Sequence, residues 1–141
     1  MMQTILLPVV IIFFGVILRL IPHMPNFAPI TAIALFGGMY LDKKYALIIP
    51  LIIMLISDYF LGFHDTIIFV YISFAISGLL GLWARRDKNA LRILTVTLLS
   101  SVIFFLITNF GVWFMGNMYQ RTTSGLITAY VMAIPFFRNT I

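Results

Sequence analysis

Long apolar runs separated by short polar breaks fill the sequence. A helix that crosses the roughly 30 Å hydrocarbon layer needs about 20 residues, and it satisfies its own backbone hydrogen bonds. The second and last of these runs are short, and we expect Pro29 and Pro135 to kink them or break them into half-helices. A transmembrane helix is predicted over each of six runs: residues 4–21, 27–41, 45–62, 66–84, 91–115 and 123–137.

The breaks between these runs are short, so consecutive helices are expected to run antiparallel. They contain Pro, Gly, Asn and charged residues, which stop helices. No internal repeat or linker divides the chain. The first run has no Lys or Arg before it and no small-residue cleavage site after it, so we expect a retained helix and not a secretory signal. The predicted fold is an all-α polytopic membrane bundle, with residues 1–141 forming a single transmembrane domain.

Composition supports a membrane location. Hydrophobic residues make up 62% of the sequence and charged residues 9%, whereas a soluble domain has about 25% charged residues. The net charge of +5 could suggest nucleic acid, but the basic residues lie in the breaks and form no arm or helix face. Membrane lipid is therefore the expected surrounding, and nucleic acid is not an expected partner.

The Lys and Arg residues also predict an orientation. If the N-terminus is cytoplasmic, the outer side holds only two Lys or Arg residues, Arg19 and Arg121. Short loops rich in Lys and Arg stay on the cytoplasmic side, so both termini are expected there. The inner side then holds seven basic residues: Lys43, Lys44, Arg85, Arg86, Lys88, Arg92 and Arg138.

The remaining polar residues gather at the opposite, outer ends of the predicted helices. Arg19 and Asp58 have opposite charges at similar depth, so they are expected to pair. Two interpretations stay open: an interfacial salt bridge with snorkelling side chains, or two residues that line an outward-facing ligand pocket. The candidate ligand-binding residues are Arg19, His23, Asn26, Asp58, His64, Asn109 and Trp113.

Metal binding and catalysis receive little support. Two histidines and the nearby Asp58 and Asp65 are suitable ligand types, but their spacing is not diagnostic. Asp65 is more simply expected to cap the fourth helix. The chain has no Cys, no Glu and no known catalytic motif. We therefore expect no metal, no cofactor and no enzymatic activity.

Small residues form a second candidate set. In lipid, small side chains let helix backbones approach closely. Packing within the bundle and docking of a partner protein both fit this pattern. The candidate docking residues are Ala28, Ala32, Gly37 and Gly38, and Gly78 and Gly81 are similar positions on the fourth helix.

Several stretches resemble a known transporter family. RLIPH at 19–23 and PNFAPITAIALFGG at 25–38 resemble the first loop and second helix of the substrate-binding S components of energy-coupling-factor (ECF) transporters. SDYFLGFHD at 57–65, TNFGVW at 108–113 and PFFRNT at 135–140 resemble a bacterial family described as transport proteins of that S-component type. The resemblance covers nearly the whole chain.

This resemblance implies a six-helix protein of the bacterial cytoplasmic (inner) membrane that captures a vitamin or similar micronutrient from outside. A T subunit and two ATPases would then drive release inward. The leading hypothesis is an S-component-like uptake protein with its small-molecule ligand at the outer face. Two alternatives stay open: a non-transporting accessory subunit of a larger membrane complex, and a membrane enzyme with Asp58 and His64 as acid and base.

Overall fold

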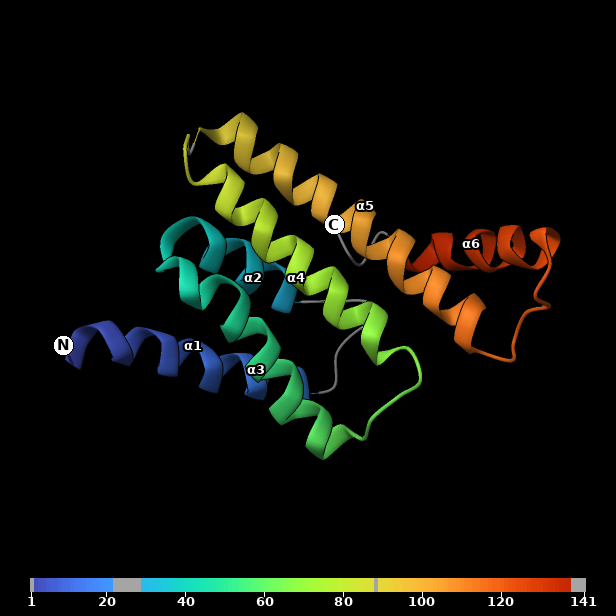
Figure 1. The fold of residues 1–141 in the computed structure, drawn as a ribbon, viewed down its shortest axis with the longest axis horizontal. Coiled ribbons are helices and arrows are strands. Elements are labelled where there is room, and N and C mark those ends of the chain that lie inside the picture. The colour runs from blue at the N-terminus through green and yellow to red at the C-terminus, as the bar shows by residue number, and fades with distance from the viewer. Residues whose placement is uncertain (1, 22–28, 88, 138–141) are drawn as a thin grey trace.

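The computed structural model is all-helical, as predicted (Figure 1). It describes residues 2–21, 29–87 and 89–137. Within the described residues, every helix boundary lies within two residues of the predicted run. The described part contains six helices: α1 (Met2–Leu20), α2 (Pro29–Tyr40), α3 (Lys43–Leu61), α4 (Ile67–Ala84), α5 (Ala90–Met115) and α6 (Thr123–Phe137).

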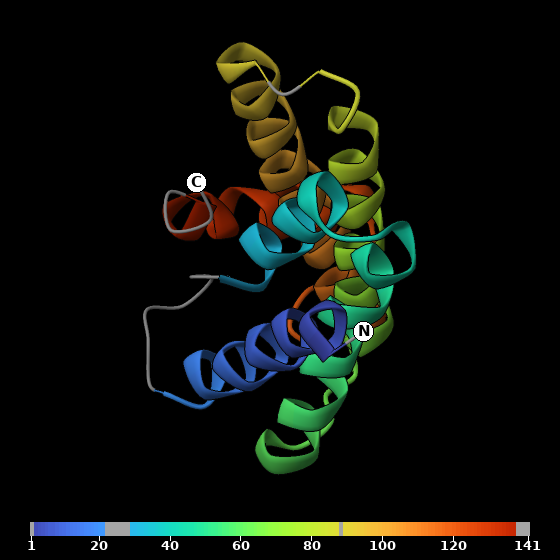
Figure 2. The same ribbon diagram turned by 90° about the vertical axis from the view of Figure 1, so that its left-hand side faces the viewer.

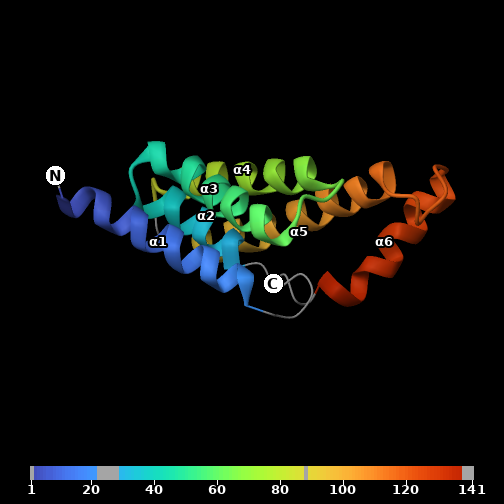
Figure 3. The same cartoon turned by 90° about the horizontal axis from the view of Figure 1, so that it is seen from below.

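The short helix α2 lies at the centre of the bundle. It contacts α1, α3, α4 and α5, whereas α6 contacts only α5 within the described part of the chain. Figures 2 and 3 show the consequence: α1 to α5 form a packed group, and α6 extends away from it beyond α5. Consecutive helices α3, α4 and α5 run in alternating directions, so the C-terminus of α3 and the N-terminus of α4 share one end (Figure 1).

Local sequence explains where the helices begin and end. The side chain of Asn89 caps α5 by accepting a 2.8 Å hydrogen bond from the Arg92 amide. Gly62, with φ of 92°, ends α3 in a conformation that favours glycine. The first described residue of α2 is Pro29, and α6 continues past Pro135 to Phe137. Pro135 therefore does not divide α6 into half-helices, and the residues before Pro29 lie outside the described part of the chain.

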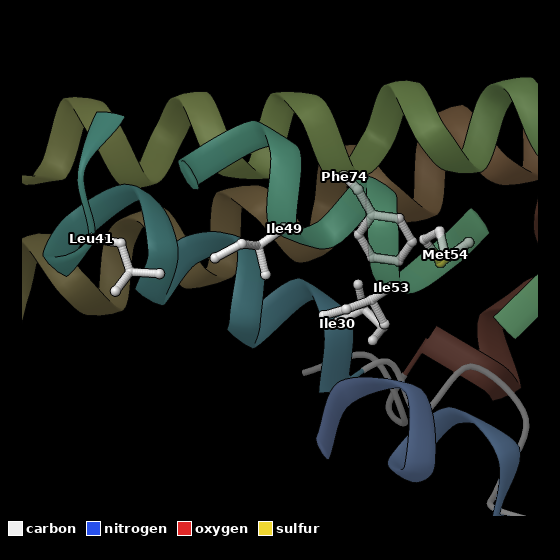
Figure 4. Packing of buried hydrophobic residues seen from close by; sticks show 6 residues of the cluster. All are labelled: Ile30, Leu41, Ile49, Ile53, Met54 and Phe74. Carbon is white, nitrogen blue, oxygen red and sulfur yellow. The ribbon is translucent and has the colours of Figure 1, made fainter. Parts of the chain in front are cut away.

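The larger hydrophobic cluster lies where α2, α3 and α4 meet (Figure 4). Ile53 and Met54 are almost fully buried, and Phe74 reaches them from α4. Ile11, Ile12 and Val16 of α1 pack against the same cluster. Its buried members are Ile30, Leu41, Ile49, Ile53, Met54 and Phe74, and a second cluster contains Leu35, Met39, Ala84 and Val96.

Glycines let α2 and α4 approach closely. A Cβ atom on Gly38 would lie 2.5 Å from the carbonyl oxygen of Gly78 and 2.6 Å from the Cα of Gly81. A Cβ on Gly81 would lie 2.5 Å from the carbonyl oxygen of Leu35. All three atoms belong to the backbone, so no side-chain rotation could make room. The close contact thus depends on glycine in both helices.

Hydroxyl groups join α4 to α5 in the middle of the bundle. Ser77 donates to the carbonyl oxygen of Ser73 at 2.9 Å, and its Oγ lies 2.5 Å from the Oγ of Ser100. All three serines are buried. Small hydroxyl side chains of this kind allow close helix packing and satisfy their polar atoms without water.

Three of the helices, α3, α4 and α5, are long and apolar enough to cross a membrane. The remaining apolar segments, Leu6–Leu20, Ile30–Tyr40 and Thr123–Pro135, are shorter. Large hydrophobic side chains also face outward, including Leu91 (74% exposed), Phe60 (68%) and Ile68 (63%). Lipid accommodates such a surface and water does not. The fold is therefore that of a helical membrane protein.

Candidate functional site

A buried ion pair joins the C-terminal ends of α1 and α3. Arg19 lies in the last turn of α1, and Asp58 lies three residues before the end of α3. Arg19 Nη1 lies 2.5 Å from Asp58 Oδ1. The Asp58 side chain is 1% exposed and the Arg19 side chain 17%. The pairing predicted from their charges and depth is thus present.

Tyr71 of α4 completes the carboxylate's contacts. Its hydroxyl donates a 2.9 Å hydrogen bond to Asp58 Oδ2, so both carboxylate oxygens have a partner. Arg19 Nη1 also donates to Ser57 Oγ and approaches the carbonyl oxygen of Met54 at 3.4 Å. Ser57 Oγ in turn donates to the carbonyl oxygen of Ile53 at 2.6 Å. We call Arg19, Ser57, Asp58 and Tyr71 the Asp58 network.

The directions of the helices explain why these residues meet. The chain reverses at residues 62–66, so the end of α3 lies beside the start of α4. Asp58 is four residues before this reversal and Tyr71 is five residues after it, which places them at similar depth. Arg19 reaches the same depth because α1 packs against α3. The network therefore ties three helices together at one end.

The buried Asp58 carboxylate depends on its partners to offset the cost of its burial. An unpaired buried carboxylate is strongly unfavourable, and a close guanidinium with further hydrogen bonds offsets much of that cost. Arg19 and Tyr71 supply these contacts to Asp58. The arrangement can hold a charge pair at membrane depth, and it leaves part of the Arg19 side chain exposed.

The turn between α3 and α4 carries two more of the polar residues. His64 and Asp65 are both exposed. The N-cap position of α4 is Thr66, no side chain caps the helix there, and the Ile67 amide donates instead to the His64 carbonyl oxygen at 3.1 Å. The expected capping role of Asp65 is therefore wrong. His64 lies on the same end of the bundle as the Asp58 network.

Asn109 and Trp113 make local contacts on and after α5. Asn109 Nδ2 donates to the carbonyl oxygen of Phe105, one turn earlier, at 2.8 Å. Trp113 Nε1 donates to the carbonyl oxygen of Gln120 in the following loop at 2.9 Å. Neither bond reaches the Asp58 network. The candidates His23 and Asn26 lie outside the described residues.

A small hollow adjoins the loop held by Trp113. Its volume is about 200 Å³, and its lining mixes polar and apolar side chains. The loop and the first turns of α6 supply all of its lining residues, Met118, Tyr119, Gln120, Ser124, Gly125 and Thr128. Antiparallel α4 and α5 place this hollow at the end of the bundle that also carries the Asp58 network (Figure 1).

The candidate docking residues lie in different places. Gly37 and Gly38 are buried, Gly37 beside Ala46 of α3 and Gly38 against α4. Ala32 is exposed. Ala28 lies outside the described residues. The two glycines thus take part in packing within the bundle.

Ser57 and Tyr71 are the members of the network that sequence reasoning missed. Tyr71 stands within a long apolar run and belongs to no motif. Tyr71 lies five residues after the turn at residues 62–66 and Asp58 lies four residues before it, and this similar spacing is the signal that could have identified Tyr71. Ser57 directly precedes Asp58, and its hydroxyl reaches Arg19 because it lies on a buried face of α3.

Comparison with known proteins identifies a family but no activity. The fold and the buried charge pair define a helical membrane protein with a polar site at one end. The whole chain, residues 1–141, matches DUF6580, described as a family of unknown function, and the chain belongs to that family. No curated protein and no solved structure shows significant similarity to it.

Proposed function

We propose that the protein is a membrane-embedded, S-component-like substrate-binding protein for uptake of a vitamin or similar micronutrient. In this proposal all six helices span the bacterial cytoplasmic membrane and both termini are cytoplasmic. The ligand binds at the outer face, at the end of the bundle that carries the Asp58 network. A T subunit and ATPases would supply the energy for release.

The observation that carries the proposal is the buried Arg19–Asp58 pair. Ionisable residues inside membrane helices are rare and usually mark a ligand or ion pathway. Here Ser57, Asp58 and Tyr71 fix the position of Arg19, while part of its side chain remains exposed. A guanidinium held in this way suits a carboxylate or phosphate group. Many micronutrients carry such a group, so Arg19 is the proposed anchor for the ligand.

The distribution of charge supports the outer location. Arg121 is the one Lys or Arg residue in the turn at residues 62–66 and the loop after α5. The opposite end of α3, α4 and α5 carries Lys43, Lys44, Arg85, Arg86 and Arg92. By the positive-inside rule the basic end faces the cytoplasm. The Asp58 network then faces outward, where an imported molecule first meets the membrane.

Ligand binding can be tested on the purified full-length protein. Native mass spectrometry would detect a co-purified small molecule, and thermal unfolding with a panel of water-soluble vitamins would identify a binder. At a ligand concentration 100 times Kd, binding should stabilise the protein by about 2.7 kcal/mol. Arg19→Lys keeps the charge but loses the planar guanidinium, so we expect it to weaken binding.

Asp42→Asn is the matched control, because Asp42 is exposed at the opposite end of α3. This variant should bind the ligand as the unaltered protein does. Failure of every compound to bind or co-purify would contradict the proposal. So would a ligand whose affinity is the same for the protein and for its Arg19→Lys variant.

A second candidate function is a non-transporting accessory subunit of a larger membrane complex. The arrangement of α6 favours it, because α6 contacts only α5 among the described helices. Its apolar residues Ile127, Val131 and Met132 are more than half exposed. Co-purification at fixed stoichiometry with a complex that contains no ATPase would favour this function over uptake.

A further inference from the structure

A basic cavity lies at the end of the bundle opposite to the Asp58 network. Its volume is about 460 Å³. It lies between the first residue of α3 and the last turn of α4 with the residues that follow. Three of its five lining residues are cationic, and the other two are apolar or aromatic: Lys43, Leu82, Trp83, Arg85 and Arg86.

One guanidinium nitrogen of Arg85, which lines this cavity, has no hydrogen-bond acceptor among the described residues. Arg85 Nε donates to the carbonyl oxygen of Gly38 at 3.0 Å, which fixes the guanidinium against the last turn of α2. Its Nη2 is buried and has no partner among the described residues. Buried guanidinium nitrogens are normally satisfied, so an acceptor is expected at this position. Arg85 lines the cavity, so an anion bound there would lie beside this guanidinium.

The neighbouring carboxylates leave the three cations unneutralised. The ion pairs within the described part of the chain are Arg19–Asp58 and Arg92–Asp87. Asp87 also accepts a 2.7 Å hydrogen bond from Asn89. Asp42 is exposed, makes no cap bond to α3 and does not line the cavity. The cavity therefore keeps an excess of positive charge.

The surroundings indicate the kind of anion. Leu82 and the Trp83 ring form apolar walls, and the Trp83 ring is held by the Arg92 guanidinium 4.1 Å from its centroid. One turn before Trp83, the side chain of Leu79 is 52% exposed on the apolar surface of α4. A molecule with an anionic head and a hydrocarbon tail matches both the cationic lining of the cavity and the apolar surface of α4. Basic pockets between helix ends are typical binding sites for anionic lipid headgroups.

We propose that this cavity binds the phosphate headgroup of an anionic phospholipid. Lys43, Arg85 and Arg86 contact the phosphate, and the acyl chains lie along Leu82 and the exposed apolar face of α4. The site is separate from the Asp58 network. It requires only that the bundle is embedded in a membrane, so it stands whether or not the protein imports a small molecule.

The test is a lipid titration of the purified full-length protein in detergent, followed by native mass spectrometry. Phosphatidylglycerol is compared with phosphatidylcholine, whose phosphate is balanced by a choline cation. The double variant Lys43→Gln, Arg86→Gln removes two exposed cations that line the cavity. Each cation near an anionic lipid contributes roughly a factor of five in affinity, so phosphatidylglycerol binding should weaken about 25-fold.

The matched control is Lys44→Gln, Arg121→Gln, which removes the same net charge from exposed residues outside the cavity. It should leave phosphatidylglycerol binding within about two-fold of the original, because neither side chain lines the cavity and exposed charges are screened by salt. Equal binding of the two lipids would overturn the proposal, as would equal losses in the two double variants. Displacement of the lipid by millimolar inorganic phosphate would show a free-phosphate site and would also overturn it.

Discussion

Tyr71 donates a 2.9 Å hydrogen bond to Oδ2 of Asp58, on the side of the carboxylate away from Arg19. The bond crosses from α4 to α3, and the Arg19 contact continues to α1. One almost fully buried carboxylate thus connects three helices. Its removal should affect both the stability of the bundle and the position of Arg19.

Asp58→Asn should lower the free energy of unfolding by about 3 to 5 kcal/mol, because it leaves the mostly buried Arg19 without its counter-ion. Reversible unfolding in mixed micelles measures this change. Asp42→Asn replaces an exposed carboxylate directly before the first residue of α3. This variant should change the free energy of unfolding by less than about 0.5 kcal/mol. Equal effects of the two variants would contradict the buried pair.

The paired variant Arg19→Met, Asp58→Leu should be more stable than Asp58→Leu alone. Replacing both members of a buried ion pair with apolar residues removes the uncompensated charge that a single replacement leaves. A double variant no more stable than the single one would show that Arg19 does not depend on Asp58. The same unfolding assay gives the comparison.

Tyr71→Phe should cost about 2 kcal/mol of unfolding free energy, since a hydrogen bond to a charged group contributes about 1.5 to 3 kcal/mol. Tyr59→Phe is its matched control, because Tyr59 lies next to Asp58 but is 76% exposed. Only the Tyr71 variant should also weaken binding of a ligand held by Arg19. An equal loss of stability in both variants would remove the role given to the Tyr71 hydroxyl.

Two adjacent glycines on α2 should respond differently to alanine. Gly38→Ala places a Cβ 2.5 Å from the Gly78 carbonyl oxygen, and the helices must separate to accept it. We expect a loss of about 1 to 3 kcal/mol, as for other overpacked sites. At Gly37 the nearest atom would be the Ala46 Cα at 3.7 Å, an ordinary contact, so Gly37→Ala should be tolerated. Equal tolerance at both positions would show that α2 and α4 are not closely packed.

Sequence patterns predicted the helices well, because each apolar run ends at Pro, Gly or charged residues. They failed at Pro135, which does not divide α6 into half-helices. Whether a proline starts or interrupts a helix depends on which preceding residues are already helical, and an apolar run of 15 residues does not show this.

The site was predictable only in part. Opposite charges at similar depth identified the Arg19–Asp58 pair. The third partner, Tyr71, depends on which helix packs beside α3, and composition contains no such information. Asn109 was grouped with the same site, but its side chain bonds to its own helix. An amide on a membrane helix can satisfy itself locally, and sequence alone does not separate the two outcomes.

The orientation of the bundle is the central claim, because it places the Asp58 network outside and the basic cavity inside. The chain has no cysteine, so single cysteines at two exposed turns report it directly: Asp65→Cys between α3 and α4, and Asp87→Cys between α4 and α5. A membrane-impermeant maleimide should label Asp65→Cys in intact cells and Asp87→Cys only after permeabilisation. The reverse pattern, or labelling of both cysteines from outside, would contradict the account.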